Sequence, residues 1–191
     1  MSPNSTLQDI IHMKTITWLH FSDIHIGNPK SEWEYEKIKD KFITDLKKMR
    51  NDNGLQPDLI FFTGDAVFGH LGSGGGRSMS DQYDEVEKVF SAVREVYDPS
   101  VPKENFFIVP GNHDTNISTI NEFADKAYFE SINSKDYETA TKELSSTINS
   151  KNIPWNDYQR RLHDYCLFLE KHAYSHLLGV CRTYSFNSMA I

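Results

Sequence analysis

The sequence lacks an excess of basic side chains. Its 20 Lys and Arg residues are outnumbered by 27 Asp and Glu residues, which gives a formal net charge of -7. Proteins that coat nucleic acids usually carry a basic excess, because neutralising phosphates supplies much of their affinity. The charge balance therefore argues against a coat protein. It leaves a local basic groove open, so a nucleic acid stays possible as a substrate, although the net charge does not indicate one.

Long hydrophobic runs are also missing. The runs Leu59–Phe62 and Phe106–Val109 are far shorter than the roughly 18 to 20 residues that a membrane-spanning helix needs. We therefore expect no membrane partner. The first 14 residues lack the basic start and the continuous apolar stretch of a secretory signal. We interpret residues 1–13 as an N-terminal tail and expect a cytoplasmic protein.

Cysteine is scarce as well. The chain has 2 cysteines, Cys166 and Cys181, which lie outside any CxxC pattern. Two isolated cysteines in a cytosolic chain are more often reduced core residues than a disulfide bridge. We interpret this pair in that way.

Glycine is concentrated in one segment. From Gly69 to Gly76, five of eight residues are glycine, which indicates a mobile connection. A phosphate-binding loop is the more specific alternative interpretation of this segment. That loop needs Lys followed by Ser or Thr after its last glycine, whereas Arg77 stands there, so a plain loop is the better interpretation.

Residues 14–109 alternate between strand-like and helix-like patterns. Strands are indicated by β-branched and aromatic residues and by short continuous apolar runs, and helices by apolar residues three and four positions apart. Ser31 and Glu34 fit a capping box at the first helix. The predicted order is strand 14–21, a helix through Tyr35, Ile38, Phe42, Leu46 and Met49, strand 59–63, helix 81–97 and strand 106–109. This β-α-β-α-β order predicts an α/β fold with a parallel sheet.

The second half of the chain has a different character. Residues 116–176 are polar and suit helices, with an apolar stripe through Tyr158, Leu162, Tyr165, Cys166 and Leu169, so we expect a helical insertion or cap. Residues 182–191 return to strand-like composition, and the chain ends on three apolar residues. We expect one domain over residues 14–191 that is incomplete at its C-terminus.

Three polar clusters follow the three predicted strands. They are Asp23-Ile24-His25, Gly64-Asp65 and Gly111-Asn112-His113-Asp114. The carboxyl ends of parallel strands meet at one edge of a sheet, where ligands bind. Carboxylate, imidazole and amide donors suit a divalent ion of the Mn, Fe or Zn kind. Any one cluster alone is typical of a turn, but together and in strand order they are a strong signal.

This series of motifs resembles that of the calcineurin-like metallophosphoesterases, whose pattern is D-x-H, G-D and G-N-H-D or G-N-H-E after successive strands. The resemblance covers residues 15–114, and more loosely Phe186-Asn187-Ser188. It implies half of an α/β sandwich. It also implies that Asp23 and His25 bind a first metal ion, that Asp65 bridges two ions, and that Asn112 binds the second.

The resemblance further assigns two catalytic residues. His113 would stabilise the developing charge on a substrate phosphate or protonate the leaving oxygen, and Asp114 would accept a hydrogen bond from that imidazole and hold its orientation. The implied reaction is hydrolysis of a phosphomonoester or phosphodiester, in which two metal ions lower the pKa of a water and the resulting hydroxide attacks phosphorus.

The later histidine motifs of the family do not appear in this sequence. The chain therefore resembles the N-terminal part of a longer phosphoesterase. The second metal site is doubtful, activity is weak or absent without the missing half, and a complementing chain is an expected partner. The alternative is a non-catalytic metal-binding or protein-interaction module of a larger multidomain protein.

The other histidines have less specific interpretations. His20 has the opposite strand parity to Asp23, which favours a structural role. His70 is expected to be exposed in the glycine loop. His172 and His176 are four positions apart, as in some metal-binding pairs, but the glutamate motif of such pairs is missing.

Overall fold

The computed structural model describes residues 15–30, 32–70, 76–119, 121–150 and 160–178. Its strands and α-helices, in chain order, are β1 (Trp18–Phe21), α1 (Glu32–Asn53), β2 (Leu59–Thr63), α2 (Met79–Glu95), β3 (Phe106–Val109), α3 (Glu122–Asn133), α4 (Tyr137–Ser150) and α6 (His163–Lys171). Short 3-10 turns occupy Lys103–Asn105, Ile117–Thr119 and Ser175–Leu177. The predicted β-α-β-α-β order is confirmed.

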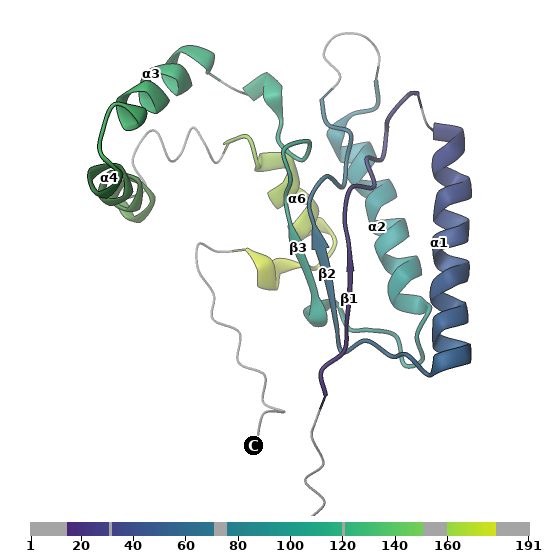
Figure 1. Ribbon diagram of the computed structural model, residues 1–191. Helices are drawn as coiled ribbons and strands as arrows, with labels where there is room; N and C mark the ends of the chain where they lie inside the picture. The colour runs from purple at the N-terminus through teal and green to yellow at the C-terminus, as the bar shows by residue number, and fades with distance from the viewer. Residues whose placement is uncertain (1–14, 31, 71–75, 120, 151–159, 179–191) are drawn as a thin grey trace, which may run out of the picture.

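The sheet has 3 parallel strands in the order β1-β2-β3. Leu19 pairs with Ile60, and Ile60 pairs with Phe106, so alternate residues of the strands form rows across the sheet. Strands β2 and β3 have the predicted bounds. The parallel arrangement brings the carboxyl ends of all three strands to one edge (Figure 1).

One face of the sheet is covered by α1, α2 and α6. Phe21 of β1 contacts Phe42 of α1 and Phe90 of α2, with ring centroids 5.4 and 6.0 Å apart. Phe90 is fully buried and also contacts Phe168 of α6 at 6.3 Å. Figure 1 shows α1 and α2 on the same side of the strands. Aromatic burial on this face forms the core that holds the strand ends in place.

Among the described residues, the opposite face of the sheet is only partly covered. Trp18 is 62% exposed and Val109 is 53% exposed. Between these ends, Phe61 and Phe107 stack at 5.4 Å and are half-buried. The single-sided covering agrees with the expectation of half a sandwich, and the α/β fold class is correct.

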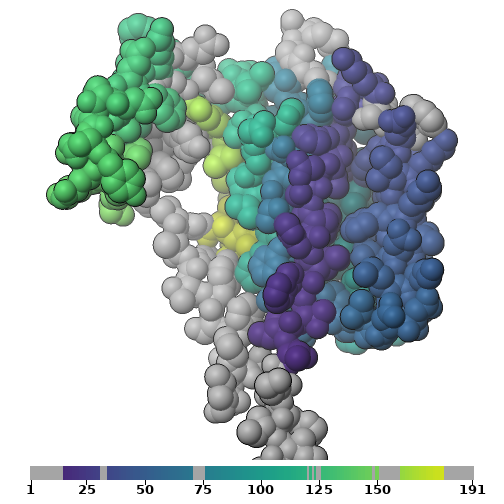
Figure 2. Space-filling model, in the orientation of Figure 1, coloured from purple at the N-terminus to yellow at the C-terminus, as the bar shows by residue number. Residues whose placement is uncertain are grey.

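The helices after β3 divide into two groups. Helix α6 joins the core: Tyr165, Phe168 and Leu169 are buried, and the Tyr165 hydroxyl donates to the Ile108 carbonyl at 2.9 Å. Helices α3 and α4 form a hairpin that projects away from the sheet (Figures 1 and 2). In the described part of the chain, no helix is both long and apolar enough to cross a membrane. The bounds expected for the tail, the domain and the insertion stay predictions.

Some local predictions need correction. Helix α2 begins at Met79 rather than residue 81, because Ser78 caps it by accepting a hydrogen bond from the Asp81 N–H at 3.1 Å. In α1, Ile38 and Met49 of the predicted apolar stripe are exposed, whereas Leu46 is buried. Cys166 is half-buried and carries a free thiol. Ser31, Tyr158, Cys181, residues 182–191 and most of the glycine loop lie outside the described residues.

Candidate metal centre

The loops after β1 and β2 run side by side beyond the ends of their strands. The N–H groups of Asp23 and His25 donate to the carbonyls of Gly64 and Asp65, both at 3.0 Å. Ile26 then forms a parallel bridge with Val67. The backbone ladder of the sheet is thereby continued into the loops. It fixes the D-x-H segment against the G-D segment, as the convergence of parallel strands predicts.

Three predicted metal ligands have a left-handed backbone. The φ angles are 61° at Asp23, 45° at His25 and 58° at Asp65. Non-glycine residues adopt this region rarely, and each such residue costs on the order of 1 kcal/mol or more. Of the described non-glycine residues, only Ala173 shares this feature. The strain is thus concentrated where the sequence places metal ligands, and it turns these side chains to one edge of the sheet.

Two motif glycines allow the second and third loops to touch. A Cβ at Gly111 would lie 2.2 Å from Asp65 Oδ1, and a Cβ at Gly64 would lie 2.9 Å from the Gly111 Cα. Gly64 also has a φ of 103°. Glycine is therefore needed at both positions for the backbones to approach, which explains these motif residues in steric terms.

Three side chains from the three loops form one cluster. Ligand atoms of His25, Asp65 and His113 all lie within 4.8 Å of one another. His25 Nε2 is 3.8 Å from Asp65 Oδ2 and 3.9 Å from Asp23 Oδ1. These separations are too long for hydrogen bonds. The imidazole rings of His25 and His113 meet edge to face at 4.7 Å.

The donor set fits a divalent ion. Two ligands that lie about 2.0–2.2 Å from one ion are separated by up to about 4.4 Å. His25 Nε2 and Asp65 Oδ2 meet this condition at 3.8 Å. The Nδ1 atom of His25 is buried and has no hydrogen-bond partner among the described residues, and Nε2 is the ring nitrogen that faces the carboxylates of Asp65 and Asp23. The imidazole and the carboxylate of this pair are donors that suit Mn, Fe or Zn.

The imidazole of His113 is held by a backbone carbonyl. Its Nδ1 lies 2.9 Å from the oxygen of Phe68. A carbonyl oxygen can only accept, so Nδ1 carries the proton and Nε2 keeps its lone pair in the neutral ring. The His113 N–H also donates to Asp65 Oδ1 at 3.0 Å, which ties the third loop to the second.

The predicted role of Asp114 in orienting His113 is wrong. The Asp114 carboxylate is 1% exposed and accepts hydrogen bonds from the Ala66, Val67 and Gly111 N–H groups at 2.8 to 3.3 Å. Burial raises its pKa, and these backbone donors oppose that shift. Asp114 therefore joins the second and third loops, and Phe68 takes over the orientation of the imidazole.

The remaining predicted ligands lie at the rim of the cluster. The side chain of Asp23 is 63% exposed and faces His25. Asn112 is exposed, and its backbone carbonyl accepts a hydrogen bond from the Thr115 hydroxyl at 2.6 Å. Asp23 does not belong to the three-residue cluster found among the described residues. Their roles as ligands stay predictions.

The other histidines have partners outside the cluster. His20 Nε2 lies 2.7 Å from the Thr63 hydroxyl, which agrees with a structural role. His70 is half-buried, so its expected exposure is wrong. His172 Nε2 lies 3.1 Å from Asp84 Oδ1, and His176 Nε2 lies 3.2 Å from the Phe106 carbonyl. These two rings thus bind different groups.

Sequence reasoning missed Gln82, which supports the site from α2. Its side chain is fully buried, and Oε1 accepts from the N–H groups of Phe68 and Gly69 at 3.0 and 3.2 Å. Its Nε2 donates to the carbonyls of Gly69 and Arg77, both at 3.0 Å. Gln82 thereby fixes Phe68, which binds His113. A polar residue within the apolar stripe of α2 was the available signal.

The fold and the cluster together define an α/β domain with a candidate divalent-metal site at the carboxyl edge of a parallel sheet. The family model of the calcineurin-like phosphoesterases matches residues 16–184, so the chain belongs to that family. No curated protein sequence matches the chain significantly. The family assignment made from the motif series is confirmed.

Proposed function

We propose that this domain hydrolyses phosphate esters in a metal-dependent reaction. The observation that carries the proposal is the cluster of His25, Asp65 and His113, which the three strand ends bring within 4.8 Å of one another. The strained backbone at His25 and Asp65 supports it, because such strain is typical of functional positions. The substrate is a phosphomonoester or a phosphodiester.

Each residue has a distinct proposed task. His25 and Asp65 hold the metal, with Asp23 as a further ligand of the first ion and Asn112 as a ligand of a second. Bound divalent ions would neutralise phosphate charge and lower the pKa of the attacking water. Manganese, iron and zinc all suit these donors.

His113 is placed to act on the phosphate or on the leaving oxygen. With Nδ1 donating to the Phe68 carbonyl, Nε2 is the nitrogen that a proton can enter or leave without breaking that bond. When protonated, Nε2–H can donate to a phosphate oxygen or transfer its proton to the leaving group. Gln82, Phe68 and Asp114 support the loops, and they need not contact the substrate.

The first experiment measures manganese uptake by calorimetry together with hydrolysis of bis(p-nitrophenyl) phosphate. Asp65→Asn removes a carboxylate from the cluster, so we expect metal affinity and turnover to fall by about a hundredfold or more. Asp45→Asn is the matched control, because Asp45 is an exposed residue of α1. Equal turnover in the Asp65→Asn variant and the original chain would defeat the proposal.

A second candidate function is a non-catalytic module for metal binding or protein interaction. The α3–α4 hairpin favours it, because Phe123 and Tyr137 are 86% and 87% exposed there. Large exposed apolar side chains of this kind are typical of interaction surfaces when they form a patch. Stoichiometric manganese uptake without hydrolysis of any phosphate ester would favour this candidate.

A further inference from the structure

A cavity of about 430 Å³ opens beside the metal centre, between the end of β1 and helix α1. Its volume falls within the roughly 300–1,000 Å³ of ligand pockets. Its walls come from the end of β1 and the loop after it, from α1 and from α2. The lining residues used below are Asp23, His25, Tyr35, Ile38, Lys39 and Phe42.

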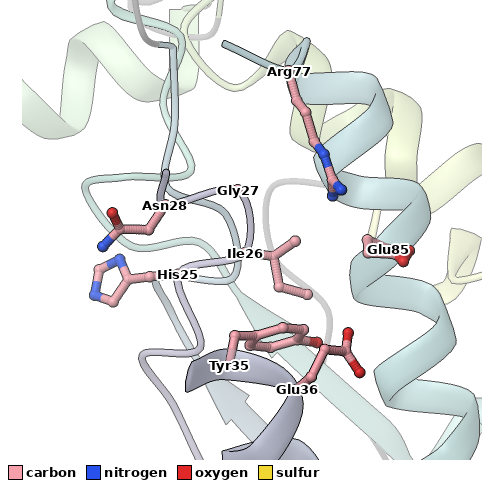
Figure 3. Close-up of a pocket in the computed structure, with 8 residues that line it drawn as sticks. All are labelled: His25, Ile26, Gly27, Asn28, Tyr35, Glu36, Arg77 and Glu85. Atoms are coloured by element: carbon pink, nitrogen blue, oxygen red, sulfur yellow. The ribbon is translucent and has the colours of Figure 1, made fainter. Parts of the chain in front are cut away.

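The cavity is continuous with the metal centre. Asp23 and His25 line it and also face each other across 3.9 Å in the centre. Figure 3 shows a smaller neighbouring hollow, in which His25 and Asn28 on the loop lie opposite Tyr35 of α1. These three residues line both spaces. A phosphate held at His25 would therefore place its ester group within reach of the cavity.

The chemistry of the walls defines what would fit there. Phe42 and Ile38 of α1 supply apolar surface, and Ile38 is 64% exposed although it lies on the apolar stripe of the helix. Tyr35 adds an aromatic ring, and its hydroxyl has no hydrogen-bond partner among the described residues. Exposed apolar surface that lines a cavity beside a polar centre is typical of a site for an organic ligand.

The charge at the cavity argues against a second anionic group. The ammonium of Lys39 pairs with the carboxylate of Glu36 and lies 5.7 Å from the ring centroid of Tyr35. The pair leaves no net positive charge at this wall. An uncharged aromatic group would bury apolar surface here, and its binding would not carry the free-energy cost of removing a charged group from water.

We propose that this cavity binds the organic group of the substrate, and that the substrate class is phosphate esters with an uncharged aromatic group. This inference rests on the proposed function, because the phosphate must be held at the metal centre. It assigns Ile38 and Phe42 of α1 to substrate selection.

The test compares two phosphonates, which cannot be hydrolysed because carbon replaces the ester oxygen. Binding of 1-naphthylphosphonate and of methylphosphonate to the manganese-loaded full chain is measured by calorimetry. We expect the naphthyl compound to bind about tenfold more tightly or better, since its ring enters the cavity. Equal affinities would overturn the inference.

The variant Ile38→Asp places a charge on the apolar wall. The ratio of the two affinities should then fall toward one. Met49→Asp is the matched control, because Met49 is 48% exposed on the same helix and does not line the cavity. It should keep the ratio of the original chain. A ratio that is unchanged in Ile38→Asp would overturn the inference, and thermal unfolding checks that both variants are folded.

Two further outcomes are decisive. Absence of manganese uptake by the original chain defeats the proposed function and this inference with it, whereas uptake with equal phosphonate affinities defeats the inference alone. Sedimentation analysis tests a second copy of the chain as the occupant of the cavity. If the original chain is a dimer and Ile38→Asp dissociates it, a second copy of the chain covers the cavity. That result would also overturn the proposal.

Discussion

The loops at the strand ends and the α3–α4 hairpin differ in how they use buried polar groups. At the strand ends, Gln82 of α2 and Asp114 of the third loop are 0% and 1% exposed and hold the loops through hydrogen bonds to several backbone groups. In the hairpin, Phe123 and Tyr137 are more than 80% exposed. Its described buried side chains are Ile132 and Thr147.

This difference predicts where a substitution should affect residues that the substituted side chain does not contact. Polar side chains in the loops connect segments from three strands and α2, so a change at one residue moves others. The hairpin contacts are local: the Tyr128 hydroxyl donates to the Thr147 hydroxyl at 3.1 Å, and Lys142 pairs with Glu138 at 2.6 Å. The Lys142–Glu138 pair stabilises its own helix by only a few tenths of a kcal/mol, and the Tyr128–Thr147 bond joins α3 only to its neighbour α4.

The largest expected effect is that of Gly111→Ala. The added Cβ would lie 2.2 Å from Asp65 Oδ1 and 2.5 Å from the Asp65 nitrogen, so the two loops must separate. We expect the free energy of unfolding to fall by about 3 kcal/mol and manganese affinity to fall with it. Thermal unfolding and calorimetric titration measure the two effects.

The control for Gly111→Ala is Gly54→Ala, which separates close contact from backbone strain. Gly54 follows α1, has a φ of 64°, and a Cβ there would meet nothing within 4 Å. Its substitution should cost about 1 kcal/mol through conformation alone and leave metal uptake intact. If both variants lost equal stability and equal manganese affinity, the close contact between the loops would not explain the need for glycine at position 111.

The second prediction concerns Gln82→Leu. Removal of the amide leaves backbone groups of Gly69 and Arg77 without their buried partner, so we expect a loss of about 2 kcal/mol. Phe68 also loses one of the two acceptors of its N–H and keeps the Ile26 carbonyl at 2.8 Å, so the imidazole of His113 should change position. The pH profile of hydrolysis should therefore shift, which a loss of stability alone would not cause.

Two variants make the Gln82 prediction more specific. Gln82→Glu keeps an acceptor for the Phe68 and Gly69 N–H groups but loses both donations, so its effect should be intermediate. Thr147→Val changes a buried polar residue of the hairpin and should lower stability by about 1 kcal/mol without shifting the pH profile. If Thr147→Val shifted the pH profile of hydrolysis by the same amount, the loops and the hairpin would not differ in this respect.

The sequence predicted the parts of the fold that depend on patterns along the chain. The apolar runs 59–63 and 106–109 became β2 and β3 with no change of bounds, since short continuous apolar runs favour strands, although helices cover only one face of this sheet. Asp65 and His25 were expected to lie close together because the carboxyl ends of parallel strands meet at one edge of the sheet. The left-handed backbone at these residues carries no signal in the sequence, because Asp and His occur in many other conformations.

The errors in the candidate site have a common cause. The imidazole of His113 binds the carbonyl of Phe68, and the Asp114 carboxylate accepts mainly from backbone N–H groups, besides the Tyr83 hydroxyl at 3.3 Å. Every residue carries a carbonyl, and all but proline carry an N–H, so residue type does not reveal which of them a side chain will reach. The position of Gln82 in the apolar stripe of α2 indicated burial, but not which backbone groups its amide would reach. Motif spacing predicts which side chains meet, but not which backbone groups orient them.

The smallest predicted effect is at the junction of α2 and α6. A hydrogen bond from Lys171 lowers the pKa of the Asp84 carboxyl, and His172 Nε2 lies 3.1 Å from the same carboxylate. A lowered pKa in the folded state stabilises the protein above the unfolded value of about 4, and this contribution is lost as pH falls through the folded pKa. Asp84 is 41% exposed, so solvent limits the effect to a few tenths of a kcal/mol.

Thermal unfolding of Asp84→Asn at several pH values measures this contribution. The variant should be slightly less stable than the original chain at pH 7, and the difference should vanish as pH falls well below about 4, where Asp84 becomes protonated. Glu138→Gln is the counterpart in the hairpin, because Glu138 pairs with Lys142 one turn further along the same helix. Asp84 joins two helices that are far apart in sequence, whereas Glu138 acts within α4, so only Asp84→Asn should weaken the attachment of α6 to α2. Hydrogen exchange at α6 would detect that loss, and faster exchange there in Glu138→Gln would contradict the independence of the hairpin.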